Sequence, residues 1–382
     1  MNKNKNFKVI DGHIHYSLPT TPEMISDMLK MTDTEMGNLV ALYDKRRASG
    51  TLDCLYAKDK LKGKIYVYGA NDITQYIKGG NIGKELAKHV KDLMECGCDG
   101  IKMLEGKPTS RKRYPIPNFD IPEMDDYFKY LEENNINVVW HVNDPEEFWD
   151  SEKCPDWAKR SGWFYDNSFV NNEDQYTQIE NVLKRHPNLR IIFAHFYFLS
   201  AQLDRLGYLF DRFPNICVDI TPGIELFENL SKNKEKGREF FIKYQDRILY
   251  GTDISGDESD SVPFAKDDSI IRATLCRDFL YKKEIFMKGN PNSLLGANDF
   301  TLNGLELDEE IVNKILYKNF YTRNNEPKTL NYKAILKECT KERERIKYLC
   351  KYYGFEENTK YLDFIENYFS KKWLIKKSYL TN

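Results

Sequence analysis

The chain has 382 residues, and its 57 Lys and Arg against 59 Asp and Glu give a net charge of −2. This balance provides no basic field for nucleic acid, and no apolar stretch approaches the roughly 20 residues needed to cross a bilayer. The first six residues are polar and do not resemble a secretory signal, and the eight cysteines are scattered. Both features favour a reduced, cytoplasmic setting.

Eight apolar, β-branched or aromatic runs predict strands, and helical patterns lie between most of them. Strand and helix alternation favours a parallel sheet with helices outside, and eight strands favour closure into a (β/α)8 TIM barrel. The second run is ambiguous, because residues 36–42 also fit a helix. The expected strands are Phe7–Asp11, Asn38–Leu42, Lys64–Gly69, Gly100–Leu104, Asn137–Val142, Arg190–Phe196, Ile216–Ile220 and Ile248–Asp253.

The first run leads into Asp11-Gly12-His13-Ile14-His15. Side chains at positions i and i+2 of a strand lie on the same face, about 7 Å apart. Two imidazoles at that spacing can converge on one cation, with metal–nitrogen bonds of roughly 2.0–2.1 Å. The pair therefore indicates a metal site.

Three further residues end later runs: His141 on strand 5, His195 on strand 6 and Asp253 on strand 8. A single His after an apolar strand is more often a core or surface residue than a ligand. The C-terminal ends of barrel strands gather on one face, however, and that face carries the active site. The ordered set therefore predicts a metal centre. His89 and His186 lack this context and are interpreted as structural or solvated.

Candidate substrate-binding residues lie on strand 4 and in the segments that follow strands 4 and 5. Lys102 lies on strand 4, and Lys107 and Arg111 follow it. The long segment from residue 143 to about 172 carries Trp149, Trp157 and Trp163. Long loops in a compact domain are usually lids or binding loops. We expect Lys102, Lys107, Arg111 and Trp149 to bind a small, planar, carboxylate-bearing substrate. A solvated turn and a satellite core under the loop remain as alternatives.

Neutral imidazoles with one carboxylate suit Zn²⁺, which is the preferred assignment, and also Mn²⁺, Fe²⁺ or Co²⁺. A metal with an open position lowers the pKa of its bound water toward 7 and polarises a substrate oxygen. Asp253 can bind such a metal and also take a proton from that water. His195 can serve a second metal, or act as a general acid/base and oxyanion donor beside a single one.

The ordered His-x-His, His, His, Asp set over residues 7–253 resembles the amidohydrolase superfamily. Gly251-Thr252-Asp253 and the segment 315–320 are similar to motifs of the branch that includes aminocarboxymuconate-semialdehyde decarboxylase and related lactone hydrolases. The resemblance implies one divalent metal, with His195 acting on the substrate or the water. Its ligands would be His13, His15, His141 and Asp253.

The number of metals depends on strand 4. Dinuclear members of the superfamily carry a carboxylated lysine or a glutamate there, and this chain has both Lys102 and Glu105. A carboxylated Lys102, or Glu105 as a ligand, would add a second metal. The single-metal interpretation is preferred.

We expect a metal-dependent hydrolase whose activated water attacks a C–N or C–O acyl bond (amide, lactone or ester) of a small, carboxylate-bearing molecule. The alternative is a metal-dependent non-oxidative decarboxylase of a small, aromatic or unsaturated carboxylic acid, since both reactions use the same five residues. A third hypothesis is a noncatalytic barrel that keeps the metal for stability or binding. No nucleic acid or membrane partner is expected.

The expected division is a barrel over residues 1–326 and a helical extension over residues 327–382. The extension repeats apolar and charged residues at helical spacing, as in residues 361–369. Its aromatic stripe predicts a face that packs on the barrel or on a second subunit of a homo-oligomer.

Overall fold

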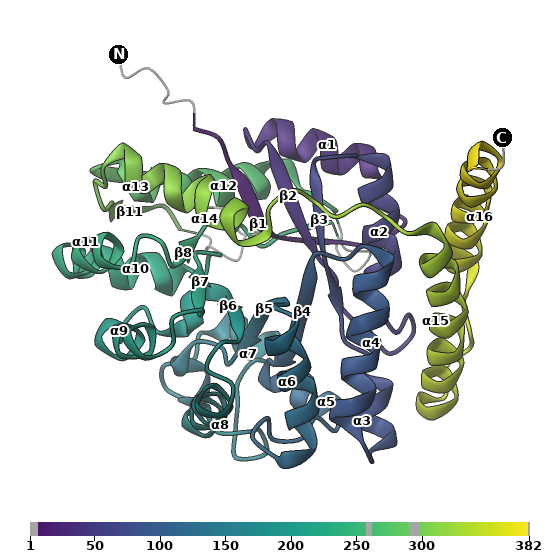
Figure 1. Cartoon of the computed structure of the whole chain (residues 1–382). Coiled ribbons are helices and arrows are strands. Elements are labelled where there is room, and N and C mark those ends of the chain that lie inside the picture. The colour runs from purple at the N-terminus through teal and green to yellow at the C-terminus, as the bar shows by residue number, and fades with distance from the viewer. Residues whose placement is uncertain (1–6, 257–261, 290–297, 381–382) are drawn as a thin grey trace.

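The computed structural model describes residues 7–256, 262–289 and 298–380. Residues 1–6, which are not expected from the sequence to be an export signal, lie outside the described residues. One parallel sheet has the strand order β8-β7-β6-β5-β4-β3-β2-β1-β9, and helices surround it (Figure 1). This arrangement confirms the TIM-barrel prediction. The strands are β1 Ile10–Tyr16, β2 Met36–Val40, β3 Ile65–Ala70, β4 Gly100–Gly106, β5 Asn137–Val142, β6 Arg190–Phe193, β7 Cys217–Asp219, β8 Ile248–Leu249 and β9 Ile254–Gly256.

The eighth strand of the barrel is interrupted. β8 pairs with β7, whereas β9, which follows after four intervening residues, pairs with β1. The Gly12 N–H donates to the Tyr250 carbonyl at 3.0 Å, and the Asp253 N–H donates to the His13 carbonyl at 2.9 Å. Backbone bonds therefore close the ring across the interruption, and they set Asp253 beside His13.

The helices cover the barrel because their apolar residues recur at helical spacing. In α4, Ile82, Leu86, Val90 and Leu93 are buried as that spacing predicts, and the helix ends at Gly97 with a φ of 105°. In the described part of the chain, no helix combines the length and the apolar character that a membrane span needs. The main helices up to residue 281 are α1 Pro22–Met31, α2 Thr51–Lys60, α4 Ile82–Cys96, α6 Asp125–Glu133, α8 Asn172–Arg185, α9 Leu203–Arg212, α10 Ile224–Lys232, α11 Lys234–Lys243 and α12 Lys266–Tyr281.

Shorter elements occupy the loops. A two-stranded antiparallel pair, β10 with β11, follows α12. The bounds are α3 Thr74–Lys78, α5 Pro108–Arg113, α7 Asp156–Arg160, β10 Glu284–Met287, β11 Phe300–Asn303, α13 Glu309–Asn313 and α14 Asn319–Asn324.

The segment after the barrel seals its N-terminal end. Phe320 of α14 packs with the interior barrel residues Ile10, Val40 and Tyr66. A Cβ on Gly12 would lie 3.0 Å from both the Phe320 ring and the Tyr250 carbonyl, so only glycine allows this close approach. The Asn319 amide donates to the carbonyls of Gln245 and Ile248, each at 2.7 Å.

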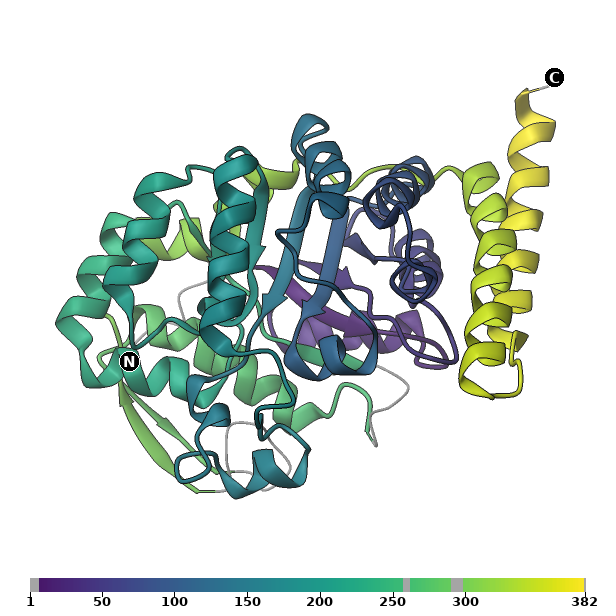
Figure 2. The ribbon, with the colours of Figure 1, turned by 90° about the horizontal axis from the view of Figure 1, so that it is seen from below.

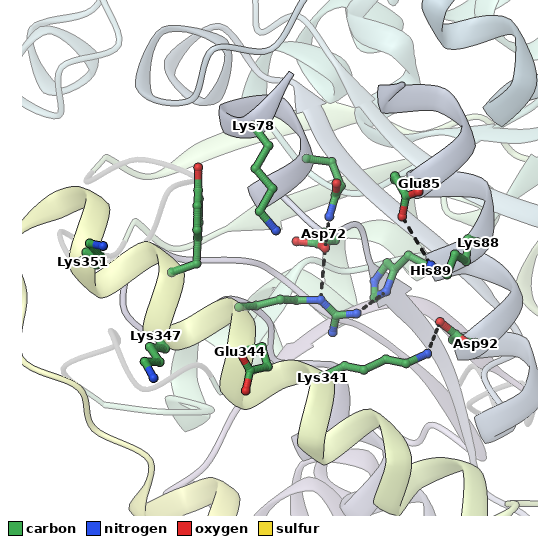
Figure 3. Close-up of a pocket in the computed structure, with 13 residues that line it drawn as sticks. Asp72, Lys78, Glu85, Lys88, His89, Asp92, Lys341, Glu344, Lys347 and Lys351 are labelled. Atoms are coloured by element: carbon green, nitrogen blue, oxygen red, sulfur yellow. Dashed lines mark hydrogen bonds and ion pairs between the residues drawn. The ribbon is translucent and has the colours of Figure 1, made fainter. Parts of the chain in front are cut away.

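The C-terminal extension forms two long helices, α15 (Tyr332–Tyr353) and α16 (Lys360–Leu380), that stand beside the barrel near α2 and α4 (Figures 1 and 2). At the interface, the buried Arg345 guanidinium lies 3.1 Å from Asp72, and it donates to His89 at 3.0 Å. Asp72 and His89 both turn toward that guanidinium (Figure 3). His89 is therefore structural, as the sequence indicates.

Candidate metal centre

His13 and His15 lie within β1, which runs on to Tyr16, rather than beyond the strand end. The His13 Nδ1–H donates to the Asp219 carboxylate at 2.9 Å, and the His15 Nδ1–H donates to the Val40 carbonyl at 3.1 Å. Both acceptors fix the same tautomer, because neither can donate a proton. The Nε2 lone pair of each ring is thus left for a cation.

Asp253 completes a convergent group with these two histidines. Its carboxylate lies 3.0 Å from His15 Nε2 and 3.6 Å from His13 Nε2. The ligand atoms of the three residues lie within 4.8 Å of one another. Burial alone would raise the pKa of Asp253, but a hydrogen bond from His15 and the positive charge of protonated imidazoles, whose place a bound metal would take, hold the pKa well below its usual range. The carboxylate is therefore ionised at neutral pH.

The donor set fits a divalent metal. Two unprotonated imidazole nitrogens and one ionised carboxylate face a common point, and such ligands suit Zn²⁺ and similar ions. Burial lowers the pKa of His13 to about 4, so its ring is neutral, as a metal ligand must be. The Asp219–His13 bond is the carboxylate–histidine support that metal sites commonly use.

Lys102 lies at the same point. Its Nζ is 2.9 Å from His13 Nε2, and burial lowers its pKa to about 8. Glu105 does not reach the centre, because its carboxylate accepts bonds from Asn71 at 2.9 Å and Tyr76 at 3.0 Å on the outer side of β4. These contacts give no support to Glu105 as a second-metal ligand.

His141 stays outside the convergent group. Its Nε2 lies 3.2 Å from the Asp144 carboxylate, which also pairs with Lys107 and accepts a bond from the Tyr165 hydroxyl. The His141 ring faces His195, with ring centroids 4.9 Å apart. The structure thus brings three of the four expected ligands together and places His141 next to them.

His195 has a strained backbone. β6 ends at Phe193, two residues before it, and φ is 55° at His195, 56° at Phe196, 59° at Tyr197 and 53° at Phe198. Each such residue costs roughly 1–2 kcal/mol outside glycine. Strain of this kind collects at functional sites. The turn ends the strand early and directs the His195 ring toward His13, with centroids 5.7 Å apart.

Hydrogen bonds also fix the His195 tautomer. The Thr221 hydroxyl donates to Asp219, so it accepts from His195 Nδ1–H at 3.1 Å. Nε2 is therefore an acceptor. Burial lowers the pKa of His195 to about 3, and the resting ring is neutral.

Sequence reasoning did not identify Asp219, Thr221, Asp11 and Asp144. Asp219 holds both His13 and the backbone of His195, the latter at 2.8 Å. Asp11 accepts from the backbone and the hydroxyl of Thr252, next to Asp253. Asp219 ends β7 and is the second-last residue of the expected run 216–220, so its position carried a usable signal. Asp144 lies in a loop, where no pattern marks it.

A cavity of about 380 Å³ adjoins the centre. Asp253, His195 and His141 contribute to its lining, and Lys107 and several aromatic and acidic side chains supply much of the rest. Trp157 and Trp163 line it, while Trp163 and Phe148 also belong to a small core around Tyr165. The loop after β5 is thus both a cavity wall and a satellite core.

The expected carboxylate-binding rim receives little support. The Arg111 guanidinium points to α8, where it donates to Gln175 and Gln178, and it does not line the cavity. The Trp149 indole donates to the Val170 carbonyl and is also outside the lining. Lys102 faces His13. Only Lys107 reaches the cavity, and Asp144 neutralises it.

Comparisons with known proteins give the family and the fold of this chain. A family model described as amidohydrolase matches residues 84–319. The structure of an amidohydrolase II superposes with a TM-score of 0.50 at 15% identity, covering 83% of this chain and 99% of that one. The Metarhizium anisopliae IDCase in apo form gives 0.50 at 10% identity, covering 83% and 96%. The 2,6-dihydroxybenzoate decarboxylase from Rhizobium gives 0.48 at 12% identity, covering 83% and 98%. No curated protein matches in sequence. At these identities the two matches with a TM-score of 0.50 show a shared fold and nothing more.

Proposed function

Because this chain belongs to the amidohydrolase family, we propose that it is a metal-dependent hydrolase that cleaves a C–N or C–O acyl bond of a small molecule, as in an amide, lactone or ester. The observation that carries the proposal is the convergence of His13, His15 and Asp253 at one end of the barrel, beside a cavity of substrate size. Active sites of this fold lie on that face.

His13, His15 and Asp253 would hold the metal, and we assign His141 as the fourth ligand from its place at the end of β5. Zn²⁺ is the preferred ion, with Mn²⁺, Fe²⁺ or Co²⁺ as alternatives. A bound divalent ion supplies Lewis acidity and lowers the pKa of a water molecule. One ion per chain is proposed; a carboxylated Lys102 would add a second.

Two residues would move or hold protons. Asp253 is ionised and lines the cavity, so it accepts a proton from the attacking water and passes it to the leaving group. His195 presents an acceptor Nε2 beside it. With a proton taken up from solvent at Nε2, it would hydrogen-bond to the developing oxyanion and keep that proton throughout. Thr221 and Asp219 hold its ring in place throughout.

An assay of the metal-loaded protein against lactones, esters and amides, with parallel detection of CO₂ release from aromatic and unsaturated acids, tests the proposal. We expect metal-dependent hydrolysis that Asp253→Asn abolishes. Asp204→Asn, a change of the same chemistry at an exposed position paired with Lys236, is the matched control and retains full activity. CO₂ release without hydrolysis would assign the decarboxylase instead. Metal binding without either reaction would support the noncatalytic barrel.

A further inference from the structure

We propose that the cavity beside the metal centre recognises a substrate with a cationic group, such as an ammonium or amidinium, at the end remote from the scissile bond. This inference rests on the proposed function, because it takes the cavity as the substrate pocket. It replaces the carboxylate-bearing substrate expected from the sequence, since Arg111 and Lys102 have other partners.

Acidic side chains reach the cavity from two separate loops. Glu147 comes from the 3₁₀ turn Glu146–Trp149 after β5, and Glu225 and Glu228 come from α10 after β7. Burial, together with the charges of Glu147, Asp144 and Glu228, raises the pKa of Glu225 to about 7. Bringing like charges together in this way is unfavourable unless a cation compensates for them.

The protein supplies too few cations to do so. Lys107 is the one Lys or Arg among the described residues that line the cavity, and both oxygens of Asp144 accept its bonds, at 2.8 and 2.9 Å. Glu228 has Lys232 3.5 Å away on its exposed side. Within the described part of the chain, Glu147 and Glu225 form no ion pair. Two carboxylates therefore face the cavity without compensation.

The aromatic wall is also suited to a cation. The Lys107 ammonium already lies 4.5 Å from the centroid of the Trp163 ring, so this wall accepts positive charge. Trp157 stands edge-on to Trp163, with centroids 5.8 Å apart, and is 37% exposed. Its indole is thus available to a ligand. Uncompensated carboxylates beside aromatic rings are the chemistry that selects ammonium groups.

Calorimetric titration of the purified, metal-containing chain tests the inference without turnover. Benzyltrimethylammonium is the cationic probe, because a quaternary nitrogen cannot bind a metal, and benzenesulfonate is the anionic probe. At pH 8, where Glu225 is ionised, we expect the cation to bind at least about tenfold more tightly. Glu147→Gln and Glu225→Gln should each weaken cation binding about three- to tenfold and leave the weak sulfonate binding no weaker.

Glu146→Gln is the matched control. Glu146 adjoins Glu147 in sequence, but its side chain is exposed and does not line the cavity. Its carboxylate accepts a hydrogen bond from Gln202 instead. Cation affinity should be unchanged in this variant. Circular dichroism and metal content verify that all three variants fold.

Equal or tighter binding of benzenesulfonate, or unchanged cation affinity in both cavity variants, would overturn the inference. Its failure is separable from failure of the proposed function. Cation binding without any hydrolysis contradicts only the function, and hydrolysis of amides or esters with no preference for cationic substrates contradicts only this inference.

Discussion

Two buried clusters combine histidine with carboxylates in this protein, one at the mouth of the barrel and one under α15. Under α15, the resident cation is Arg345, which contacts Asp72 and His89 and also pairs with Glu338 at 2.5 Å and Glu342 at 2.8 Å. At the barrel mouth, the imidazole lone pairs and Asp253 face one another, and the Lys102 ammonium donates a hydrogen bond to His13.

The difference shows how a metal site is distinguished from a structural ion network. The Arg345 guanidinium has four partners and is not readily displaced by another cation, because its planar donors match several acceptors at once. Burial lowers the pKa of the Lys102 ammonium to about 8, so Lys102 competes less strongly with a metal for the position beside His13. The cluster under α15 therefore stabilises the docking of that helix, whereas the cluster at the barrel mouth would exchange its ammonium for a metal.

Of the changes that distinguish the two clusters, substitution of His195 should have the largest effect, on the rate of the reaction. We predict that His195→Asn retains its metal and loses about 10²–10⁴-fold in rate, the usual contribution of one acid/base group. Elemental analysis and kcat on the same preparation measure both quantities. Loss of half the metal in this variant would support a dinuclear centre.

Arg345 should affect stability rather than chemistry. We predict that Arg345→Met lowers the free energy of unfolding by about 3–5 kcal/mol, because it leaves the buried carboxylates of Asp72 and Glu338 without their cation. Urea denaturation gives the free energy. Metal content per folded chain should stay constant, and a fall in metal content at low denaturant would show that the two clusters are coupled.

Asp219 tests the tautomer argument. One of its oxygens accepts from Thr221 and from the His195 backbone, and the other accepts from His13. In Asp219→Asn the amide oxygen should keep the first set, which turns the NH₂ toward His13 and moves the ring proton to Nε2. We predict a 10–100-fold loss of metal affinity by competition with a chelator. Glu342→Gln, the same chemical change under α15, should leave that affinity intact.

The smallest effect concerns pH. Burial raises the pKa of Glu342 from 4.5 to about 8, so folding favours its protonated form. Its contribution to stability is full below pH 4.5 and is lost as the pH rises from there through about 8. We predict that Tm of Glu342→Gln falls less than that of the wild type between pH 5 and 8. Parallel Tm curves for the two proteins would contradict this assignment.

Much of the site could be predicted from the sequence, because a residue at the C-terminal end of a barrel strand must lie on the active-site face of the barrel. His13, His15 and Asp253 converge as the barrel order requires, and Lys102 faces the interior of β4. The structure ends β6 at Phe193, three residues before the expected end at Phe196, and nothing in the sequence signals the four successive left-handed residues 195–198.

Loop side chains were less predictable, since their direction has no period. Arg111 and Trp149 turn to α8 and to the satellite core instead of the cavity. The division at residue 326 remains a prediction, although α15 begins at Tyr332. Asp219 could have been found by treating every carboxylate at a strand end as a candidate.

The most direct test of the metal centre is elemental analysis of protein purified without chelator, for the wild type and for the double variant His13→Ala/His15→Ala. We predict close to one equivalent of divalent metal per wild-type chain and none in the double variant. The double variant should still fold, because the cluster around Arg345 under α15 is unchanged. An unchanged metal content in the double variant, or a wild-type chain that binds no metal when zinc is supplied, would contradict the assignment.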